Sequence, residues 1–152
     1  METVRVGIIG SGNISNAHVT AFRAVPGVEV VAQHSRNPER GRAFCENNRI
    51  PDRHDKLEDL LARDDVHAVT VALANHVHAE YTLAAIEAGK HVIVEKPLCL
   101  AMDDGRRMVD AARERGVVLG YAEELCYLPK FVRARELADA GAVGDPFSLN
   151  AR

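Results

Sequence analysis

The sequence lacks several features that would assign it to a specialised class of protein. It has no tryptophan, aromatic residues make up only 5%, and the net charge is −3. A charge balance this close to neutral gives no reason to expect nucleic acid or an anionic membrane as a partner. The three cysteines, Cys45, Cys99 and Cys126, are odd in number and widely spaced, which fits a reducing compartment better than a disulfide framework. No Cys/His group has the spacing of a metal site, so we expect no bound metal.

Two further absences concern location. No apolar run approaches the length of a membrane span, and the first residues lack the basic-then-apolar layout of a signal peptide. We therefore expect a cytoplasmic protein. What is present is ordinary for a compact domain: of 152 residues, 47% are hydrophobic and 27% charged. A chain of this length can bury a sizeable core without disulfides.

Short apolar runs alternate with helical patterns along the chain. The runs predict strands at 4–9, 28–32, 68–73, 91–95 and 117–121, and the helical patterns fall at 13–24, 37–47, 77–88, 101–115 and 129–140. Continuous apolar strands are typical of a parallel sheet that helices cover on both faces. Right-handed crossovers then favour an α/β fold with a doubly wound, mainly parallel Rossmann sheet.

Local signals refine the helix boundaries. Asn37 is placed to cap the helix that starts at the following proline, and Gly116 lies where a helix should end. Asp55 and Glu58 form a capping-box pattern ahead of a leucine-rich turn. A short strand is also expected around Ile50.

The end of the chain follows a different pattern. Apolar and polar residues alternate over 147–152, as in a half-exposed strand of an antiparallel sheet. We therefore predict a nucleotide-binding domain over 1–145, and over 146–152 the first strand of a second domain that is absent from this sequence. The alternative is a frayed tail or an added edge strand.

A glycine-rich turn follows the first strand and opens the first helix. Gly10 permits a tight turn, Gly12 lets the backbone approach a pyrophosphate, and Asn13 and Ile14 begin a helix whose N-terminus attracts anions. Ser15 stands where the usual fingerprint has its third glycine, and it is small enough for close packing. This placement predicts dinucleotide binding; a plain tight turn, or the turn of a methyltransferase that binds S-adenosylmethionine, is the alternative.

The end of the second strand bears on which cofactor is bound. An acidic residue there would favour NAD, but the sequence has Ser35 and Arg36 instead. A serine hydroxyl and a guanidinium suit a 2′-phosphate, so we predict NADP, with NAD as the alternative. The alternative is that Arg36 is only a solvated loop residue without a role in binding.

Polar residues also follow the next two strands, on the ligand side of a parallel sheet. Asn75 either caps the following helix or contacts the cofactor, and His78 either contacts a ligand or has a structural role. Lys96, between Glu95 and Pro97, has an ammonium that could protonate a substrate oxygen, or it is a surface lysine. Pro97 restricts the backbone of Lys96 to extended conformations and allows a cis peptide bond between the two residues.

These motifs together resemble the glucose–fructose oxidoreductase/inositol dehydrogenase (Gfo/Idh/MocA) family. The resemblance rests on the glycine turn, on Asn75 with His78, and above all on the run 89–97 that ends in Glu-Lys-Pro. It implies that Lys96 lies beside the nicotinamide and assists catalysis. It also implies that Glu95 and Pro97 shape the cofactor pocket.

The resemblance further implies an NAD(P)-dependent oxidoreductase that transfers hydride between the nicotinamide and a sugar, a cyclitol or a similar alcohol or carbonyl. The family's second domain carries substrate residues and often the subunit interface, so we expect this chain alone to be inactive, and a homo-oligomer is a further expectation. The competing hypothesis is a non-catalytic dinucleotide-binding module or sensor.

Overall fold

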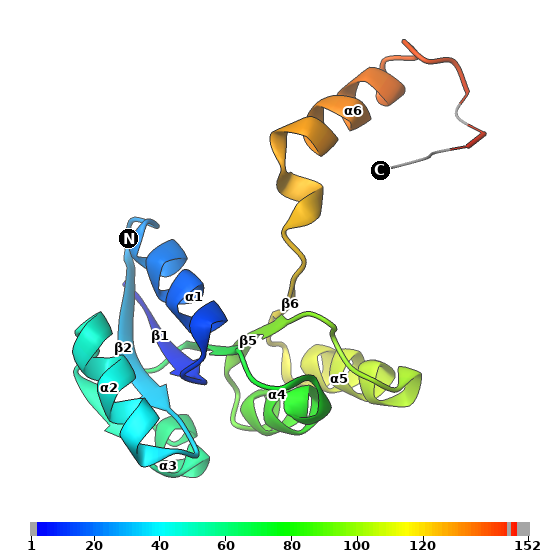
Figure 1. Ribbon diagram of the computed structural model, residues 1–152. Coiled ribbons are helices and arrows are strands. Elements are labelled where there is room, and N and C mark those ends of the chain that lie inside the picture. Colours follow the sequence, from blue (N-terminus) through cyan, green and yellow to red (C-terminus); the bar gives the residue numbers. More distant parts are fainter. Residues whose placement is uncertain (1–2, 146, 149–152) are drawn as a thin grey trace. The chain divides into compact units, whose positions relative to one another are not determined.

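The computed structural model describes residues 3–145 and 147–148 (Figure 1). The chain divides into two compact units, with the boundary between Ala122 and Glu123. The first holds all the strands that the structure describes.

The first unit is built on a six-stranded sheet in which every paired strand is parallel. Its order is β3-β2-β1-β4-β5-β6, so the chain winds outward from β1 in one direction and then from β4 in the other. The strands are β1 (Val4–Ile9), β2 (Val28–His34), β3 (Asp52–His54), β4 (Ala68–Val71), β5 (His91–Glu95) and β6 (Leu119–Ala122). The predicted doubly wound Rossmann fold is thus confirmed, and a ligand is expected at the carboxyl ends near β1 and β4, where the winding reverses.

Helices connect these strands and cover both faces of the sheet. The first unit has α1 (Asn13–Arg23), α2 (Pro38–Asn48), α3 (Leu57–Leu61), η1 (Asn75–Val77), α4 (His78–Glu87) and α5 (Met102–Arg115). The second unit has η2 (Leu125–Tyr127) and α6 (Pro129–Asp139). The predicted helices therefore lie within a few residues of the observed ones.

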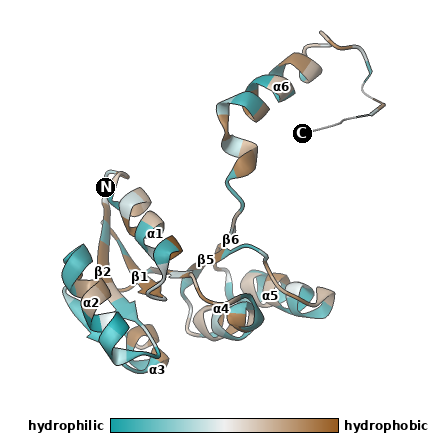
Figure 2. Ribbon diagram, viewed as in Figure 1, coloured by the Kyte–Doolittle hydropathy of each residue, from teal (hydrophilic) through white to brown (hydrophobic). Residues whose placement is uncertain are grey.

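The alternation of side chains along β1 divides the interior into two cores. Val6 and Ile8 point to one face, where they pack with Val19 of α1 and Phe44 of α2. Ile9 points to the other face, where buried residues of α3, α4 and α5 gather. In Figure 2, β1 and β2 have mainly hydrophobic colours, whereas α2 is mostly hydrophilic. Each large buried aliphatic side chain stabilises the fold by about 1.5–3 kcal/mol.

The local signals in the sequence had mixed outcomes. The predicted cap at Asn37 is confirmed: its Oδ1 accepts a hydrogen bond of 2.9 Å from the Arg40 N–H. The capping box was wrong, because α3 starts without a side-chain cap and the Asp55 carboxylate pairs with Arg53 instead. The short strand lies at 52–54, just beyond Ile50, whose side chain is buried in the core.

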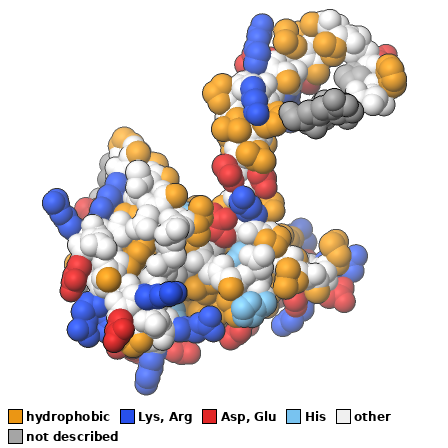
Figure 3. Space-filling model, viewed as in Figure 1, with side chains coloured by type: hydrophobic (Ala, Val, Ile, Leu, Met, Phe, Trp, Pro, Cys, Tyr) orange, Lys and Arg blue, Asp and Glu red, His pale blue; other side chains and the backbone are white. Residues whose placement is uncertain are grey.

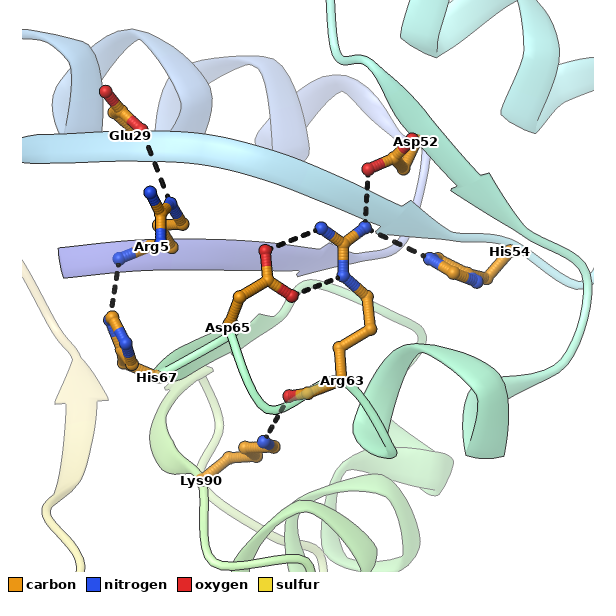
Figure 4. Close-up of polar contacts among 8 residues, drawn as sticks. All are labelled: Arg5, Glu29, Asp52, His54, Arg63, Asp65, His67 and Lys90. Carbon is orange, nitrogen blue, oxygen red and sulfur yellow. Dashed lines mark hydrogen bonds and ion pairs between the residues drawn. The ribbon is translucent and has the colours of Figure 1, made fainter. Parts of the chain in front are cut away.

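The amino ends of the strands carry an ion-pair cluster centred on Arg63 (Figure 4). Its guanidinium lies 2.8 Å from an Asp65 oxygen and 2.6 Å from an Asp52 oxygen, and its backbone carbonyl accepts a hydrogen bond of 2.7 Å from Lys90. Hydrogen bonding to Arg63 lowers the pKa of Asp65 to about 2. Because these groups lie opposite the carboxyl ends of the strands, we assign them a structural role.

The second unit exposes apolar side chains along its helices. Leu128, Phe131, Val132 and Leu137 are each more than a third exposed, and Figure 3 shows such side chains over the surface of this unit. The predicted strand at 147–152 mostly lies outside the described residues, and 147–148 have no regular structure. No helix in the described part of the chain is long and apolar enough to cross a bilayer.

Candidate functional site

The glycine turn is held in place by the two strands that flank β1. Gly10 has φ +131°, and a Cβ atom at this position would lie 2.3 Å from the carbonyl oxygen of Ala72. The Gly10 N–H donates to the His34 carbonyl at 2.9 Å, and the Gly10 carbonyl accepts from the buried amide of Gln33 at 2.9 Å. The positive φ and the carbonyl just past the end of β4 therefore require glycine here.

The next part of the turn opens to solvent. A Cβ atom on Gly12 would meet no described atom within 4 Å, so the backbone is accessible where a pyrophosphate would approach. Ser15 is fully buried, and its hydroxyl finds no hydrogen-bond partner among the described residues. The first turn of α1 has no acidic residue that would repel an anion. This arrangement fits a dinucleotide phosphate at the N-terminus of α1.

A cavity of about 340 Å³ lies beside the turn and brings together predicted residues from two strand ends. Several residues that we predicted to bind the cofactor line this cavity: Gly10, Gly12, Ile14, Ser35 and Arg36. Residues 72–74, which follow β4, complete the wall. A neighbouring cavity of about 480 Å³ is lined by Gly12 and by Asn13. The cavities thus occupy the position that the reversal of the sheet predicts.

Polar side chains gather at the end of β2. The Ser35 hydroxyl lies 3.0 Å from that of Ser11, while the Arg36 side chain is exposed. Arg40, in the first turn of α2, lines both cavities, and our sequence reasoning missed it. The sequence carries no motif that marks Arg40, and Glu39 beside it already places an anion in the same turn.

The predicted residues around Lys96 form a second group, none of which lines these cavities. Lys96 is exposed, its N–H donates to Glu95 Oε2 at 3.1 Å, and its peptide bond to Pro97 is cis. Asn75 is exposed at the start of η1 and makes no capping hydrogen bond, so the capping alternative was wrong. The structure thus leaves the Lys96 side chain free to meet a ligand.

His78 lies close to Lys96 but faces inward. Its ring is fully buried, with Nδ1 2.7 Å from the Pro97 carbonyl oxygen and Nε2 3.1 Å from the Leu73 carbonyl oxygen. These contacts match the structural alternative for His78, and its predicted contact with a cofactor stays a prediction. Our sequence reasoning gave His18 no role, yet its Nε2 lies 2.9 Å from Glu95 Oε1. No local pattern could have revealed a pairing between residues that are 77 positions apart.

The chain is similar in sequence to a known protein family and to characterised reductases. The Gfo/Idh/MocA family model, described as an oxidoreductase family with an NAD-binding Rossmann fold, matches residues 4–123. A 1,5-anhydro-D-fructose reductase from Ensifer adhaerens is 41% identical over 144 residues, which cover 95% of this chain and 43% of the reductase. The chain thus spans less than half the length of this curated relative.

Solved structures are also similar to this chain in fold and sequence. A 3-ketoreductase from Actinomadura kijaniata in complex with NADP has a TM-score of 0.84 and 36% identity, over 94% of this chain and 46% of that one. GenD2 from gentamicin A biosynthesis, in complex with NAD, has a TM-score of 0.88 and 34% identity, over 93% of this chain and 40% of that one.

Proposed function

Because this chain belongs to the Gfo/Idh/MocA oxidoreductase family, whose model matches residues 4–123, we propose that it is the NADP-binding part of a sugar or polyol oxidoreductase. The observation that carries the choice of NADP is the cavity wall formed by Ser35, Arg36 and Arg40. The sequence has no carboxylate at the end of β2 that would repel a 2′-phosphate. NAD is the alternative.

The residues present suit each part of the dinucleotide. In this proposal Gly12 and the N-terminus of α1 hold the pyrophosphate, and Arg36 and Arg40 pair with the 2′-phosphate. Asn75 contacts the nicotinamide half of the cofactor. The bound nicotinamide supplies hydride chemistry, while the chain supplies binding, orientation and electrostatics.

Lys96 is proposed as the catalytic residue. Its exposed ammonium lies past the carboxyl end of β5, where it would hold or donate the proton of a substrate hydroxyl or carbonyl oxygen. The substrate class follows from the relatives, which include reductases and dehydrogenases named for sugars and inositol. We propose that a second domain, beginning near residue 146, completes the substrate site, and that the chain alone does not turn over.

Titration of the purified chain with NADPH, NADH and S-adenosylmethionine tests the choice of cofactor. We expect NADPH to bind most tightly. Arg36→Ala and Arg40→Ala should each weaken NADPH binding about tenfold or more, as expected for loss of a charged hydrogen bond, and leave NADH binding unchanged. Arg106→Ala, at an exposed position of α5, is the matched control. Tighter binding of NADH would contradict the proposal, and preference for S-adenosylmethionine would favour a methyltransferase.

The place of Lys96 can be tested without the substrate domain. Periodate cleaves only the nicotinamide ribose of NADP, because the 2′-phosphate leaves the other ribose without a vicinal diol. The resulting dialdehyde forms an imine with a neighbouring lysine, and cyanoborohydride reduces that imine to a stable bond. We expect peptide mapping to find the label on Lys96. Lys96→Arg should abolish the label and retain NADPH binding; a label at Lys56 or Lys90 instead would refute the assignment.

A non-catalytic dinucleotide-binding module is the second candidate. It is favoured by one observation, that Lys96 lines neither of the two cavities beside the glycine turn. Both candidates predict NADPH binding, but only the oxidoreductase predicts labelling of Lys96. NADPH binding without that label would therefore favour the module.

A further inference from the structure

Two histidines hold the residues on either side of Lys96. His18, from α1, has its Nε2 2.9 Å from Glu95 Oε1, and the two side chains are only 13% and 10% exposed. His78, from α4, has its Nδ1 2.7 Å from the carbonyl oxygen of Pro97 and is fully buried. The exposed lysine is thus flanked by two contacts to rings that lie in the interior.

Polar groups in β4 and just past its end lie beside both rings. The hydroxyl of Thr70, a fully buried residue of β4, lies 3.2 Å from Nδ1 of His18. The carbonyl of Leu73, just past the end of β4, lies 3.1 Å from Nε2 of His78. The His18 ring therefore has a polar partner at both nitrogens, so its orientation is defined, whereas His78 has a carbonyl oxygen beside each nitrogen.

The Glu95 carboxylate determines which nitrogen of the His18 ring carries a proton. An ionised carboxylate only accepts hydrogen bonds, and here Glu95 accepts the Lys96 N–H on Oε2. His18 must therefore carry its proton on Nε2 to donate to Oε1. A neutral ring then accepts at Nδ1 from the Thr70 hydroxyl, which completes a chain of donors that ends on the carboxylate.

The second ring meets two carbonyl oxygens, which are acceptors only. A neutral imidazole can donate to one of them, and the contact of Nδ1 with Pro97, at 2.7 Å, is shorter than that of Nε2 with Leu73, at 3.1 Å. The geometry thus favours His78 as a donor to the Pro97 carbonyl. The two histidines act on opposite sides of one residue.

We propose that His18 and His78 are positioning residues that together hold the backbone of Lys96 in place, with Thr70 orienting the His18 ring. A lysine side chain has several rotatable bonds, so a fixed backbone is what limits the region that its ammonium can reach. This proposal rests on the proposed function only for its consequence, the approach of Lys96 to a bound dinucleotide. The restraint itself concerns the chain without ligand.

Thr70→Val offers the sharpest test, because it removes one hydroxyl and leaves His18, Glu95 and Lys96 intact. We expect the Lys96 amide hydrogen to exchange with solvent about tenfold faster, the effect of about one lost hydrogen bond. Thr82→Val is the matched control, since Thr82 is also fully buried but its hydroxyl has no partner among the described residues. Unchanged exchange at Lys96 in Thr70→Val, or equal acceleration at Lys96 and at core amides of β1, would overturn the proposal.

Substitution of the rings tests both sides of Lys96. His18→Leu should accelerate Lys96 exchange and slow its labelling by periodate-oxidised NADP, and His18→Gln should restore both, because an amide nitrogen can again donate to the carboxylate. His78→Leu should move the carbonyl carbon resonance of Pro97, with partial rescue by His78→Asn. His76→Leu, at an exposed position nearby, should change nothing.

The two proposals fail in different ways. A chain that shows neither NADPH binding nor label, but whose Lys96 exchange still responds to Thr70→Val, would refute the proposed function and keep the restraint. Normal labelling at Lys96 in His18→Leu and His78→Leu, with unaltered exchange, would refute the restraint and keep the function.

Discussion

Gly10 and Gly12 are two residues apart in one turn, yet they impose different steric demands. At Gly10 the backbone is in a region that favours glycine, and an added Cβ would collide with the carbonyl of Ala72. At Gly12 the backbone is extended, with φ −86°, and the space around an added Cβ is open. The first glycine therefore serves the fold, and the second is free to serve a ligand.

The same substitution should then separate stability from binding. Gly10→Ala should lower the free energy of unfolding by about 1–3 kcal/mol or more, the cost of backbone strain together with a steric clash. Gly12→Ala should change it by less than about 0.5 kcal/mol but weaken NADPH binding at least about tenfold, since the methyl group lies where a pyrophosphate would approach. Urea unfolding followed by circular dichroism, and NADPH titration, measure the two effects. Equal loss of stability in both variants would contradict this assignment.

At the scale of elements, His34 joins the end of β2 to its neighbours. Its Nδ1 lies 3.2 Å from the His54 carbonyl oxygen of β3, and its ring stacks on Tyr81 of α4 at 6.1 Å between centroids. Nε2 is buried with no partner among the described residues. Burial lowers the pKa of His34 below its ordinary value of 6.5, although the His54 carbonyl and the Glu58 carboxylate act in the opposite direction.

A lowered pKa predicts a dependence of stability on pH. Below about pH 6.5 the unfolded chain binds a proton at His34 that the folded chain resists, so the free energy of unfolding should fall as the pH falls toward the folded-state pKa. His34→Phe keeps a ring against Tyr81 and removes the titrating group. Urea unfolding at several values between pH 7.5 and 5 should show a shallower decline for this variant, whereas His76→Gln should behave like the parent. An undiminished slope in His34→Phe would show that other groups carry the effect.

At the scale of the whole molecule, the candidate site lies in one unit. Every residue assigned to the cofactor, to Lys96 or to its restraint lies before Glu123, and the family model ends at residue 123. The two cores that position these residues are also formed within that unit. Residues 1–122 should therefore contain what dinucleotide binding requires.

A chain shortened to end at Ala122 tests this independence. We expect it to unfold cooperatively and to bind NADPH within about threefold of the parent, because the described residues beyond Ala122 supply no part of either core or of the two cavities beside the turn. Calorimetry and NADPH titration provide the measurements. Loss of the cooperative transition, or a much weaker affinity, would mean that the second unit completes the first.

Much of the fold was predictable because its signals are local. Apolar runs located the strands, Asn37 marked a helix start, and the glycine turn with Glu-Lys-Pro identified the family. The capping box failed because Arg53, which the pattern does not include, takes the Asp55 carboxylate. Arg40 was missed because no motif marks it.

The sequence by itself determined the order of elements, the glycine that the turn requires at Gly10, and the place of Lys96 after a strand. These depend on backbone sterics and side-chain periodicity within a few residues. Only the tertiary structure decided which polar groups meet, since His18 and Glu95 are 77 positions apart and Thr70 is 52 positions from His18. The order of the strands brings such residues together, and burial then favours hydrogen bonds between the polar groups that meet.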